Sequence, residues 1–496
     1  MAEQLIITVS GLRGLVGENL TPAIAAEYGC AFGTFLKDIK SKKTTDFTDY
    51  TKFLSKSVNP CKSVSEFDSA GRTERLSVCI GRDSRPSGQM LKAATAAGLC
   101  AVGIDVVDLG LVTTPGVSIM VTELQCAGGV IITASHNPIQ YNGIKLLLGN
   151  GIAPPVEQAE RIRQYFSQKH FALVDSTECG QVTSNEQTDA RHIAKVLAII
   201  DKKTIAAKKF KVALDSVNGA GARVTKKLLA ELGCEVSAIN DEPTGIFAHP
   251  PEPTAENIKS LREAVKANRA DIGFAQDPDA DRLAIVDENG TYIGEEYTLA
   301  LAAKHVFSKF ATRNSKFEIP KAATNLSTSR MIDDIAEKVG GQVIRTAVGE
   351  ANVAGAMLHH NCIIGGEGNG GVIDLRVSPV RDSLVGIALV LQFMAETGET
   401  ISRLVGQIRG YYMIKVKFAV EQSRVRQILE STKSVLSELP GATVSIIDGY
   451  RFDFKDSWVH IRASNTEPVV RVIVEAKDQP TAQEYIKIIQ AKALIH

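Results

Sequence analysis

The stretch Thr133-Ala134-Ser135-His136-Asn137-Pro138, continuing through Tyr141-Asn142-Gly143 to Lys145, sets the expectations for the rest of the chain. It follows the apolar run Gly128-Gly129-Val130-Ile131-Ile132, which indicates a buried strand, so Ser135 is expected where a strand gives way to a loop. α/β proteins place chemistry at such strand ends. Ser135 is a candidate nucleophile, His136 a candidate proton carrier and Lys145 a cation suited to phosphate oxygens. A turn without any chemical role explains these residues equally well, because Ser, His, Asn, Pro and Gly are common in turns.

The composition is that of an ordinary globular protein with several domains. The 496 residues exceed the ~250–300 at which a single core stops growing. Lys+Arg and Asp+Glu both number 56, so we expect no nucleic-acid partner and no anionic membrane surface held by bulk charge. No run approaches the ~20 apolar residues of a membrane span, and the start of the sequence lacks a signal-peptide pattern.

Eight cysteines are scattered without CxxC pairs, and several lie in apolar runs such as Val78-Cys79-Ile80. This pattern favours buried, reduced thiols over a disulfide framework or a zinc site. We therefore expect a cytoplasmic protein.

Predicted strands and helices alternate through three successive blocks, and the C-terminal part of the chain has a different order of elements. We expect three α/β domains of similar size, at residues 1–165, 166–290 and 291–408, and a smaller α+β domain at 409–496. The order of elements suggests that the first three units are internal repeats. The polar segment Lys37 to Arg75 has little periodicity and is expected to be an insertion without an assigned role.

A glycine-rich segment, Ser10 to Gly17, follows the first expected strand and carries Arg13. Glycines let a backbone approach a ligand closely, and an Arg side chain there could grip a phosphate. A plain turn with an exposed Arg is the alternative.

Three carboxylates at alternate positions follow an expected strand in Asp277-Pro278-Asp279-Ala280-Asp281-Arg282. An all-oxygen set selects a hard cation, and Mg²⁺ is the one that partners phosphate chemistry. A calcium-binding EF-hand loop is the rival, because Glu288 falls at its twelfth position. The rival fails because Arg282 replaces the required Gly and a strand-like run follows. Ser135 and this loop together favour phosphoryl transfer.

Two later loops are polar and rich in small residues. Gly365 to Gly371 places Glu367 and Asn369 among five glycines, where a carboxylate and an amide could pair with sugar hydroxyls. Arg462 to Pro468, which contains Ser464, Asn465 and Thr466, has Arg471 just beyond it and could form a nest for a held phosphate. The alternative for the first loop is a tight connection between elements, and the alternative for the second is a polar hairpin loop.

These four loops, in this order and spread over essentially the whole chain, resemble the α-D-phosphohexomutase superfamily. Thr133 to Pro138 looks like its phosphoserine loop, Asp277 to Arg282 like its metal loop, Gly366 to Asn369 like its sugar loop and Arg462 to Pro468 like its phosphate loop. The resemblance implies three related α/β domains with mixed sheets and a fourth α+β domain around a central cleft.

It also implies an isomerase that interconverts hexose 6-phosphate and hexose 1-phosphate through phosphorylated Ser135 and a hexose 1,6-bisphosphate. Its functional residues would fall into three groups. The metal group is Ser135, Asp277, Asp279 and Asp281 around Mg²⁺. Arg13, Lys145, His136 and Arg282 would surround the transferred phosphoryl group, with His136 or Lys145 moving the proton. Glu367, Asn369, Arg462, Ser464, Asn465, Thr466 and Arg471 would bind the substrate.

The sugar is the open point of the resemblance. Many mutases that act on glucose or mannose phosphates carry Glu, Ser and His in the sugar loop, where this chain has Glu367, Asn369 and Gly371. The Glu-Gly-Asn-Gly-Gly form favours glucosamine phosphate, whereas the phosphate loop resembles that of phosphomannomutase/phosphoglucomutases. A sugar phosphatase and an inactive sugar-phosphate-binding relative are the remoter alternatives. A serine hydrolase is disfavoured because no Gly-x-Ser-x-Gly surrounds Ser135. We expect a monomer or a homodimer.

Overall fold

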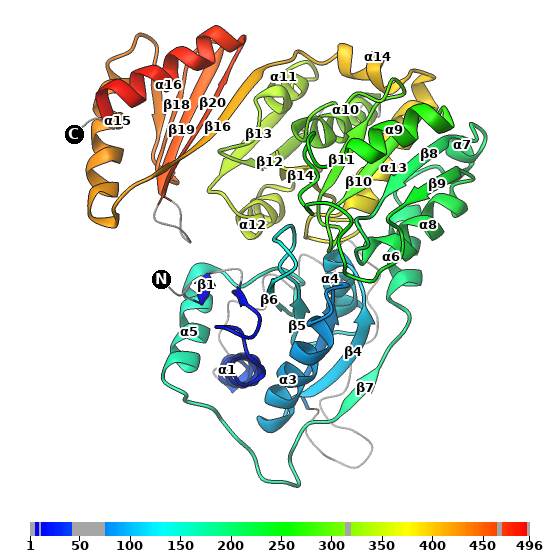
Figure 1. Cartoon of the computed structure of the whole chain (residues 1–496), viewed down its shortest axis with the longest axis vertical. Helices are drawn as coiled ribbons and strands as arrows, with labels where there is room; N and C mark the ends of the chain where they lie inside the picture. The colour runs from blue at the N-terminus through cyan, green and yellow to red at the C-terminus, as the bar shows by residue number, and fades with distance from the viewer. Residues whose placement is uncertain (1–4, 9–10, 42–74, 313–318, 464–468, 494–496) are drawn as a thin grey trace.

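Four separate β-sheets organise the chain. The computed structural model describes residues 5–8, 11–41, 75–312, 319–463 and 469–493, and Figure 1 shows how these parts are arranged. The first sheet and its helices fill the lower part of that view, the second and third lie at the upper right, and the fourth lies at the upper left. The four-domain α/β architecture expected from the sequence is confirmed.

The first sheet has seven strands in the order β1-β2-β6-β5-β3-β4-β7. Its strands are β1 (Ile6–Thr8), β2 (Gly11–Leu15), β3 (Ser77–Arg82), β4 (Asp105–Leu111), β5 (Gly128–Ile132), β6 (Tyr141–Leu148) and β7 (Val182–Ser184), and its helices are α1 (Pro22–Ser41), α3 (Gly88–Ala101), α4 (Thr114–Glu123) and α5 (Val156–Ser167). Every residue of β5 is buried, which suits a strand with both faces covered.

The second and third sheets have four strands each, β11-β10-β8-β9 and β13-β12-β14-β15. The second domain contains α6 (Thr188–Leu197), α7 (Lys202–Ala206), β8 (Lys211–Asp215), α8 (Gly221–Glu231), β9 (Glu235–Ile239), α9 (Lys259–Asn268), β10 (Ile272–Gln276) and β11 (Leu283–Val286). The third contains α10 (Glu296–Thr312), β12 (Lys321–Asn325), α11 (Met331–Glu337), β13 (Gln342–Thr346), α12 (Glu350–His360), β14 (Ile364–Glu367), β15 (Gly371–Ile373), α13 (Ser383–Thr397) and α14 (Ile401–Gly406).

The first three sheets repeat one topology. The strand sets β4-β3-β5-β6, β9-β8-β10-β11 and β13-β12-β14-β15 each have two parallel pairings followed by one antiparallel pairing. The turn of the antiparallel hairpin carries Ser135 in the first set, Asp277 to Arg282 in the second and Gly368 to Gly370 in the third. Three of the four motifs therefore occupy the same place in three repeats.

The fourth sheet is antiparallel throughout, in the order β16-β20-β19-β18-β17. Its strands are β16 (Tyr412–Ala419), β17 (Thr443–Ser445), β18 (Tyr450–Asp453), β19 (Ser457–Ala463) and β20 (Val469–Ala476), with the 3₁₀ turn η1 (Gln422–Arg424) and the helices α15 (Val425–Ser437) and α16 (Gln479–Ala493). It has its own hydrophobic core, whereas the second and third domains share one core that runs through α13. Among the described helices, none is long and apolar enough to cross a membrane.

Several sequence-based expectations on local structure need correction. Arg13 lies in strand β2 and Lys145 in strand β6, not in loops, because both segments pair with each other in the first sheet. The first sheet also receives β7, which lies beyond residue 165. Helix α1 extends into the expected insertion as far as Ser41, and residues 42–74 lie outside the described parts.

Candidate active site

Two hairpin turns from different domains meet at Ser135. The Ser135 hydroxyl Oγ donates a hydrogen bond to Asp277 Oδ2 at 2.8 Å, and both residues are buried. The backbone of Ser135 has φ of +49°, a left-handed conformation that is uncommon for a non-glycine residue. A strained backbone at a polar, buried serine is typical of a functional position.

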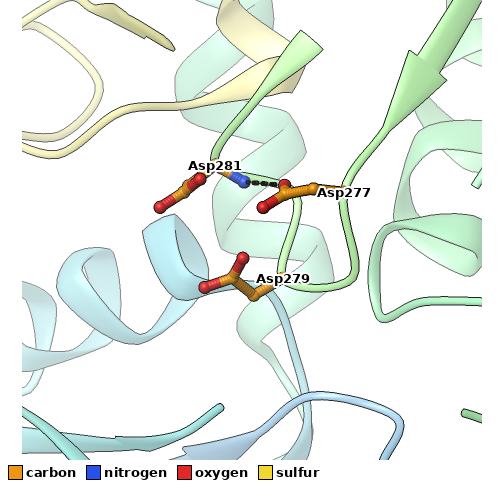
Figure 2. Close-up of side chains that lie close together, drawn as sticks. All are labelled: Asp277, Asp279 and Asp281. Atoms are coloured by element: carbon orange, nitrogen blue, oxygen red, sulfur yellow. Dashed lines mark hydrogen bonds between the residues drawn. The ribbon is translucent and has the colours of Figure 1, made fainter. Parts of the chain in front are cut away.

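The three aspartates of the second domain form a compact, buried cluster. Each offers one carboxylate oxygen within 4.8 Å of the others. Figure 2 shows the three carboxylates facing one another, with the backbone N–H of Asp281 donating to Asp277 Oδ1 at 3.1 Å. Asp279 Oδ1 and Asp281 Oδ1 are buried and have no hydrogen-bond partner among the described residues. Unpaired buried carboxylate oxygens in an all-oxygen set fit a hard divalent cation.

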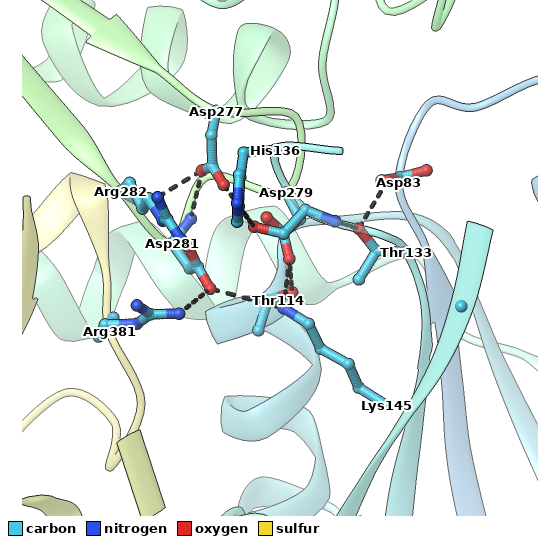
Figure 3. A network of polar contacts seen from close by, with 12 residues as sticks. Asp83, Thr114, Thr133, His136, Lys145, Asp277, Asp279, Asp281, Arg282 and Arg381 are labelled. Carbon is cyan, nitrogen blue, oxygen red and sulfur yellow. Dashed lines mark hydrogen bonds and ion pairs between the residues drawn. The ribbon is translucent and has the colours of Figure 1, made fainter. Parts of the chain in front are cut away.

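The second oxygen of Asp279 is anchored to the first domain. Thr114 Oγ1 donates to Asp279 Oδ2 at 2.7 Å, and Lys145 Nζ contacts the same oxygen at 2.8 Å (Figure 3). The backbone N–H of Thr114, at the start of α4, also donates to the Asp279 carbonyl at 3.0 Å. These contacts fix the carboxylates of one domain relative to Ser135 of the other.

Burial and crowding set the protonation of this cluster. Burial, reinforced by Asp281 and Asp279, raises the pKa of Asp277 well above its ordinary value. Burial alone lowers the pKa of Lys145, but Asp279 and Asp281 outweigh it, so the net pKa of Lys145 is raised. Lys145 is therefore protonated and positively charged beside the carboxylates. A divalent cation would relieve the remaining repulsion.

The loop that carries Ser135 is held by the buried guanidinium of Arg85. Arg85 donates to four carbonyl oxygens of the loop, those of Ser135 (2.7 Å), Asn137 (2.6 Å), Pro138 (2.7 Å) and Tyr141 (2.9 Å). Its Nε contacts Asp83 Oδ2 at 3.1 Å, and Thr133 Oγ1 donates to that same oxygen at 2.6 Å (Figure 3). The loop backbone is thus fixed from beneath by one side chain.

Polar side chains from three segments lie around Ser135. His136 Nδ1 is 3.4 Å from Ser135 Oγ, and burial, followed by Arg282 and Arg13, lowers the pKa of His136 well below its ordinary value. Arg13 donates to Asn137 Oδ1 at 2.7 Å. Arg282 pairs with Glu252 Oε1 at 3.1 Å, and His136 Nε2 lies 3.9 Å from the same oxygen. The structure therefore brings together Ser135, the three aspartates and all four residues expected beside them.

The third hairpin brings Glu367 to the edge of this cluster. Glu367 Oε1 accepts hydrogen bonds from Asn325 Nδ2 at 2.7 Å and from the Gly349 N–H at 3.2 Å. Asn369 Oδ1 is buried without a partner among the described residues, so it is available to a ligand. Glu296 lies beneath the turn, because a Cβ on Gly368 would be 2.0 Å from its carboxylate.

The fourth domain contributes two arginines. Arg462 and Arg471 are opposite one another on β19 and β20, at the ends that flank the loop between them. Burial lowers the pKa of Arg462, and Arg471 contributes to this decrease. Like charges opposite each other are destabilising unless an anion joins them. Ser464, Asn465 and Thr466 lie outside the described residues.

Sequence reasoning missed several polar residues of the site. Arg85 lies in the segment Gly81 to Gly88, and an Arg and an Asp after a buried strand could have signalled it. Thr114, Glu252 and Asn325 gave no signal, because their partners are 165, 30 and 42 residues away in sequence. Arg381 was also missed, although it contacts both Asp281 and Glu367.

Four sequence profiles of one family match the chain in succession. They are the phosphoglucomutase/phosphomannomutase α/β/α domain I at residues 64–173, domain II at 190–290, domain III at 295–411 and the C-terminal domain at 413–492. The chain belongs to the phosphoglucomutase/phosphomannomutase family. The resemblance drawn from the four loops is thereby confirmed, and with it the isomerase class of a phosphohexomutase.

Curated relatives of this family match almost end to end. A protein of Thermococcus kodakarensis named "Phosphoglucomutase/phosphomannomutase" is 37% identical, with 96% of each chain covered. A protein of Methanopyrus kandleri named "Probable phosphoglucosamine mutase" is 33% identical, with 96% of this chain and 94% of that protein covered. The relatives therefore carry both names.

Solved structures share the fold. A phosphoglucomutase/phosphomannomutase family protein from Burkholderia thailandensis matches with a TM-score of 0.79 at 24% identity and covers 98% of both chains. An N-acetylphosphoglucosamine mutase from Aspergillus fumigatus, solved with GlcNAc-6P and magnesium, matches with a TM-score of 0.59 at 15% identity, over 98% of this chain and 95% of that one.

Proposed function

We propose that this family member is a Mg²⁺-dependent phosphohexomutase that interconverts hexose 6-phosphate and hexose 1-phosphate through phosphorylated Ser135 and a hexose 1,6-bisphosphate. The observation that carries the proposal is the contact of Ser135 Oγ with Asp277 Oδ2 at 2.8 Å. It joins a hydroxyl that can carry a phosphoryl group to a buried carboxylate cluster that fits a cation.

In the proposed reaction, phosphorylated Ser135 gives its phosphoryl group to the free 1- or 6-hydroxyl of the substrate. The bond between Oγ and phosphorus breaks and a bond from phosphorus to the sugar oxygen forms. The hydroxyl proton passes to His136, because Lys145 is already protonated beside Asp279 and Asp281. The resulting bisphosphate then turns over and returns its other phosphate to Ser135. Both halves use one set of protein groups, so the intermediate must present each end in turn.

Asp277, Asp279 and Asp281 would hold Mg²⁺ together with an oxygen of phosphorylated Ser135. When bound, the ion neutralises charge on the phosphoryl oxygens. The unpaired oxygens of Asp279 and Asp281 support this assignment, as does the magnesium in the Aspergillus relative. Arg13, Lys145 and Arg282 would add positive charge around the transferred group.

The phosphate that is not transferred would bind the fourth domain. Arg462 and Arg471 would hold it with Ser464, Asn465 and Thr466 of the connecting loop. A phosphate bound there would accept hydrogen bonds from both arginines, which are opposite one another on the two strands. Glu367 and Asn369 would contact the sugar hydroxyls between the two ends.

We propose glucosamine phosphate as the sugar. The Glu-Gly-Asn-Gly-Gly form of the sugar loop, which carries Glu367 and Asn369, supports this choice. Glucose and mannose phosphates are the second candidates, favoured by the name of the Thermococcus relative. A coupled assay that compares the 1- and 6-phosphates of glucosamine, glucose and mannose separates the two.

Replacing Ser135 with Ala tests the mechanism. The variant is expected to lose interconversion and the phosphorylated Ser135 peptide in mass spectrometry, whereas the exposed serine variant Ser167→Ala keeps both. Near wild-type turnover by Ser135→Ala would refute the mechanism. Release of free phosphate in step with turnover would instead identify a phosphatase, and binding without turnover on every hexose phosphate an inactive relative.

A further inference from the structure

One arginine of the third domain connects the metal loop to the sugar loop. Arg381 lies just before α13, and its guanidinium contacts Asp281 Oδ2 at 2.6 Å, Glu367 Oε2 at 2.8 Å and Glu350 Oε2 at 3.0 Å. Figure 3 shows Arg381 extended toward Asp281. The side chain is only 11% exposed. A planar guanidinium offers donors in a fixed fork, so these contacts set a fixed geometry between their partners.

The partners of Arg381 are themselves held on their other sides. Glu367 Oε1 is occupied by Asn325 and the Gly349 N–H, so the carboxylate cannot turn away freely. Asp281 Oδ2 contacts Arg381 at 2.6 Å and Lys145 at 3.5 Å, whereas Oδ1 has no hydrogen-bond partner among the described residues and lies 3.9 Å from Arg282 Nε. Arg381 makes the shortest of these contacts, so it contributes most to leaving Oδ1 for a cation.

The backbone of Arg381 is fixed as well. Its N–H donates to Glu350 Oε2 at 2.8 Å, the same oxygen that receives its Nε. The next residue, Asp382, caps α13 by accepting from the N–H groups of Leu384 and Val385. The guanidinium is therefore carried on a rigid helix start and not on a free connection.

Glycine at position 371 leaves the space that Arg381 occupies. A Cβ on Gly371 would lie 2.1 Å from Arg381 Cδ and 2.7 Å from its Cγ. Gly371 does not have a positive φ, so the requirement is for space and not for backbone conformation. Gly371 is also one of the two positions, with Asn369, where the sugar loop departs from the commoner Glu, Ser and His pattern.

We propose that Arg381 is a positioning residue that couples the two ends of the substrate site by holding Glu367 for the sugar and Asp281 for the cation. This inference rests on the proposed mutase function. It predicts that Arg381 acts through Glu367 and Asp281 and that Gly371 is required for it to do so.

The first test is a double-mutant cycle on kcat/KM with Arg381→Met and Glu367→Gln. The cycle is measured at saturating Mg²⁺, which removes the contribution through Asp281. Residues that act through one another are non-additive, so the double variant is expected to lie within about 3-fold of Glu367→Gln alone, although Arg381→Met in the wild-type background costs about 30-fold. Losses that simply multiply would overturn the coupling to Glu367.

The second test measures Mn²⁺ affinity by electron paramagnetic resonance, which needs no turnover. Loss of the group that orients a metal ligand typically weakens binding, so Arg381→Met is expected to raise the Kd for Mn²⁺ about 10-fold. An unchanged or tighter Kd would overturn the coupling to Asp281. Arg381→Lys keeps the positive charge but lacks the planar, forked set of donors. On a logarithmic scale, it is expected to restore less than half of the loss in kcat/KM and less than half of the loss in Mn²⁺ affinity.

Two further variants separate positioning from folding. Gly371→Ala leaves the charge of Arg381 in place but displaces its side chain, so it should reproduce both effects, and it decides the question if Arg381→Met does not fold. Arg376→Met removes an arginine of the same connection that pairs with Asp374 Oδ1 at 2.9 Å. Among the described residues it has no hydrogen bond or ion pair with either loop, so it should change neither quantity. A Gly371→Ala protein with wild-type kcat/KM and Mn²⁺ affinity would overturn the inference.

Failure of the proposed function has a different result. A wild-type protein without mutase turnover on any hexose phosphate would refute the proposed mutase function. The Mn²⁺ affinities of Arg381→Met and Gly371→Ala would still test whether Arg381 positions Asp281.

Discussion

Replacing Arg85 with Met is expected to loosen the loop that carries Ser135. The arginine is fully buried, pairs with Asp83, and donates to four carbonyl oxygens between Ser135 and Tyr141. Met has a similar length but no charge and no donors, so the change removes the polar contacts while it largely keeps the packing. It also removes the stacking of Arg85 over Phe247 of the second domain, at 4.9 Å from the ring centre.

The size of the effect follows from these contacts. Removing one partner of a buried charge pair costs about 3–5 kcal/mol, because the remaining charge, here Asp83, stays buried. The four carbonyls regain water only when the loop opens, so the loss appears as easier local opening. At about 1.4 kcal/mol for each factor of ten, amide exchange in the loop should accelerate by at least about 100-fold. Displacing Ser135 by about 1 Å should lower kcat about 100-fold.

Hydrogen exchange of peptides covering residues 133–141, together with kcat on the preferred hexose phosphate, measures both effects. Arg82→Met is the matched control, because Arg82 lies three residues earlier and donates to one carbonyl, that of Asp83, at 2.9 Å. It should change loop exchange by less than about 5-fold. If Arg85→Met exchanged and turned over within about 3-fold of the wild type, the view of Arg85 as the support of this loop would be wrong.

Three further predictions concern the metal, pH and the sugar loop. Asp279→Asn should weaken Mn²⁺ binding by at least about 10-fold in a titration, since it replaces a charged ligand with a neutral one; an unchanged Kd would exclude Asp279 as a ligand. Burial raises the pKa of Glu296 to about 7, so its contribution to stability is present at low pH and is lost as pH rises through 7, by roughly 3 kcal/mol. Glu296→Gln should therefore match the wild type at pH 5 and exceed it at pH 8 in denaturant titrations, and the reverse order would contradict this. Gly368→Ala would place a Cβ 2.0 Å from the Glu296 carboxylate and should raise KM about 10-fold with a smaller change in kcat, whereas an unchanged KM would show that the turn adapts.

The fold was predictable where the chain alternates clearly between apolar strands and helices. Buried runs such as Gly128–Ile132 and Ile272–Gln276 identify central strands, and their order gives the three repeated domains. Strands β2 and β6 were missed because Gly11, Gly14 and Gly143 read as turn residues. In the sheet, Gly11 and Gly143 allow close backbone contacts, since a Cβ on Gly11 would lie 2.1 Å from the Ile144 carbonyl oxygen, and Gly14 leaves space for the Asn19 side chain.

The candidate site was predictable where chemistry is concentrated in one short segment. Ser135 and the three aspartates carry their signal locally, and the structure brings them together. Arg85 has only a weak local signal, the neighbouring Asp83 after a buried strand. Arg381 has none, because it acts through contacts between segments distant in sequence, and an arginine is commonly a surface residue.

The repeated hairpin has an evolutionary consequence. If one ancestral unit was copied twice, a single turn diverged to carry Ser135 in the first copy, the three aspartates in the second and Gly368 to Gly370 in the third. The scaffold beneath each turn could then stay unchanged while the turns specialised. New substrate preferences could arise by exchange of the third turn alone, together with the arginine that crosses it, without altering the other two.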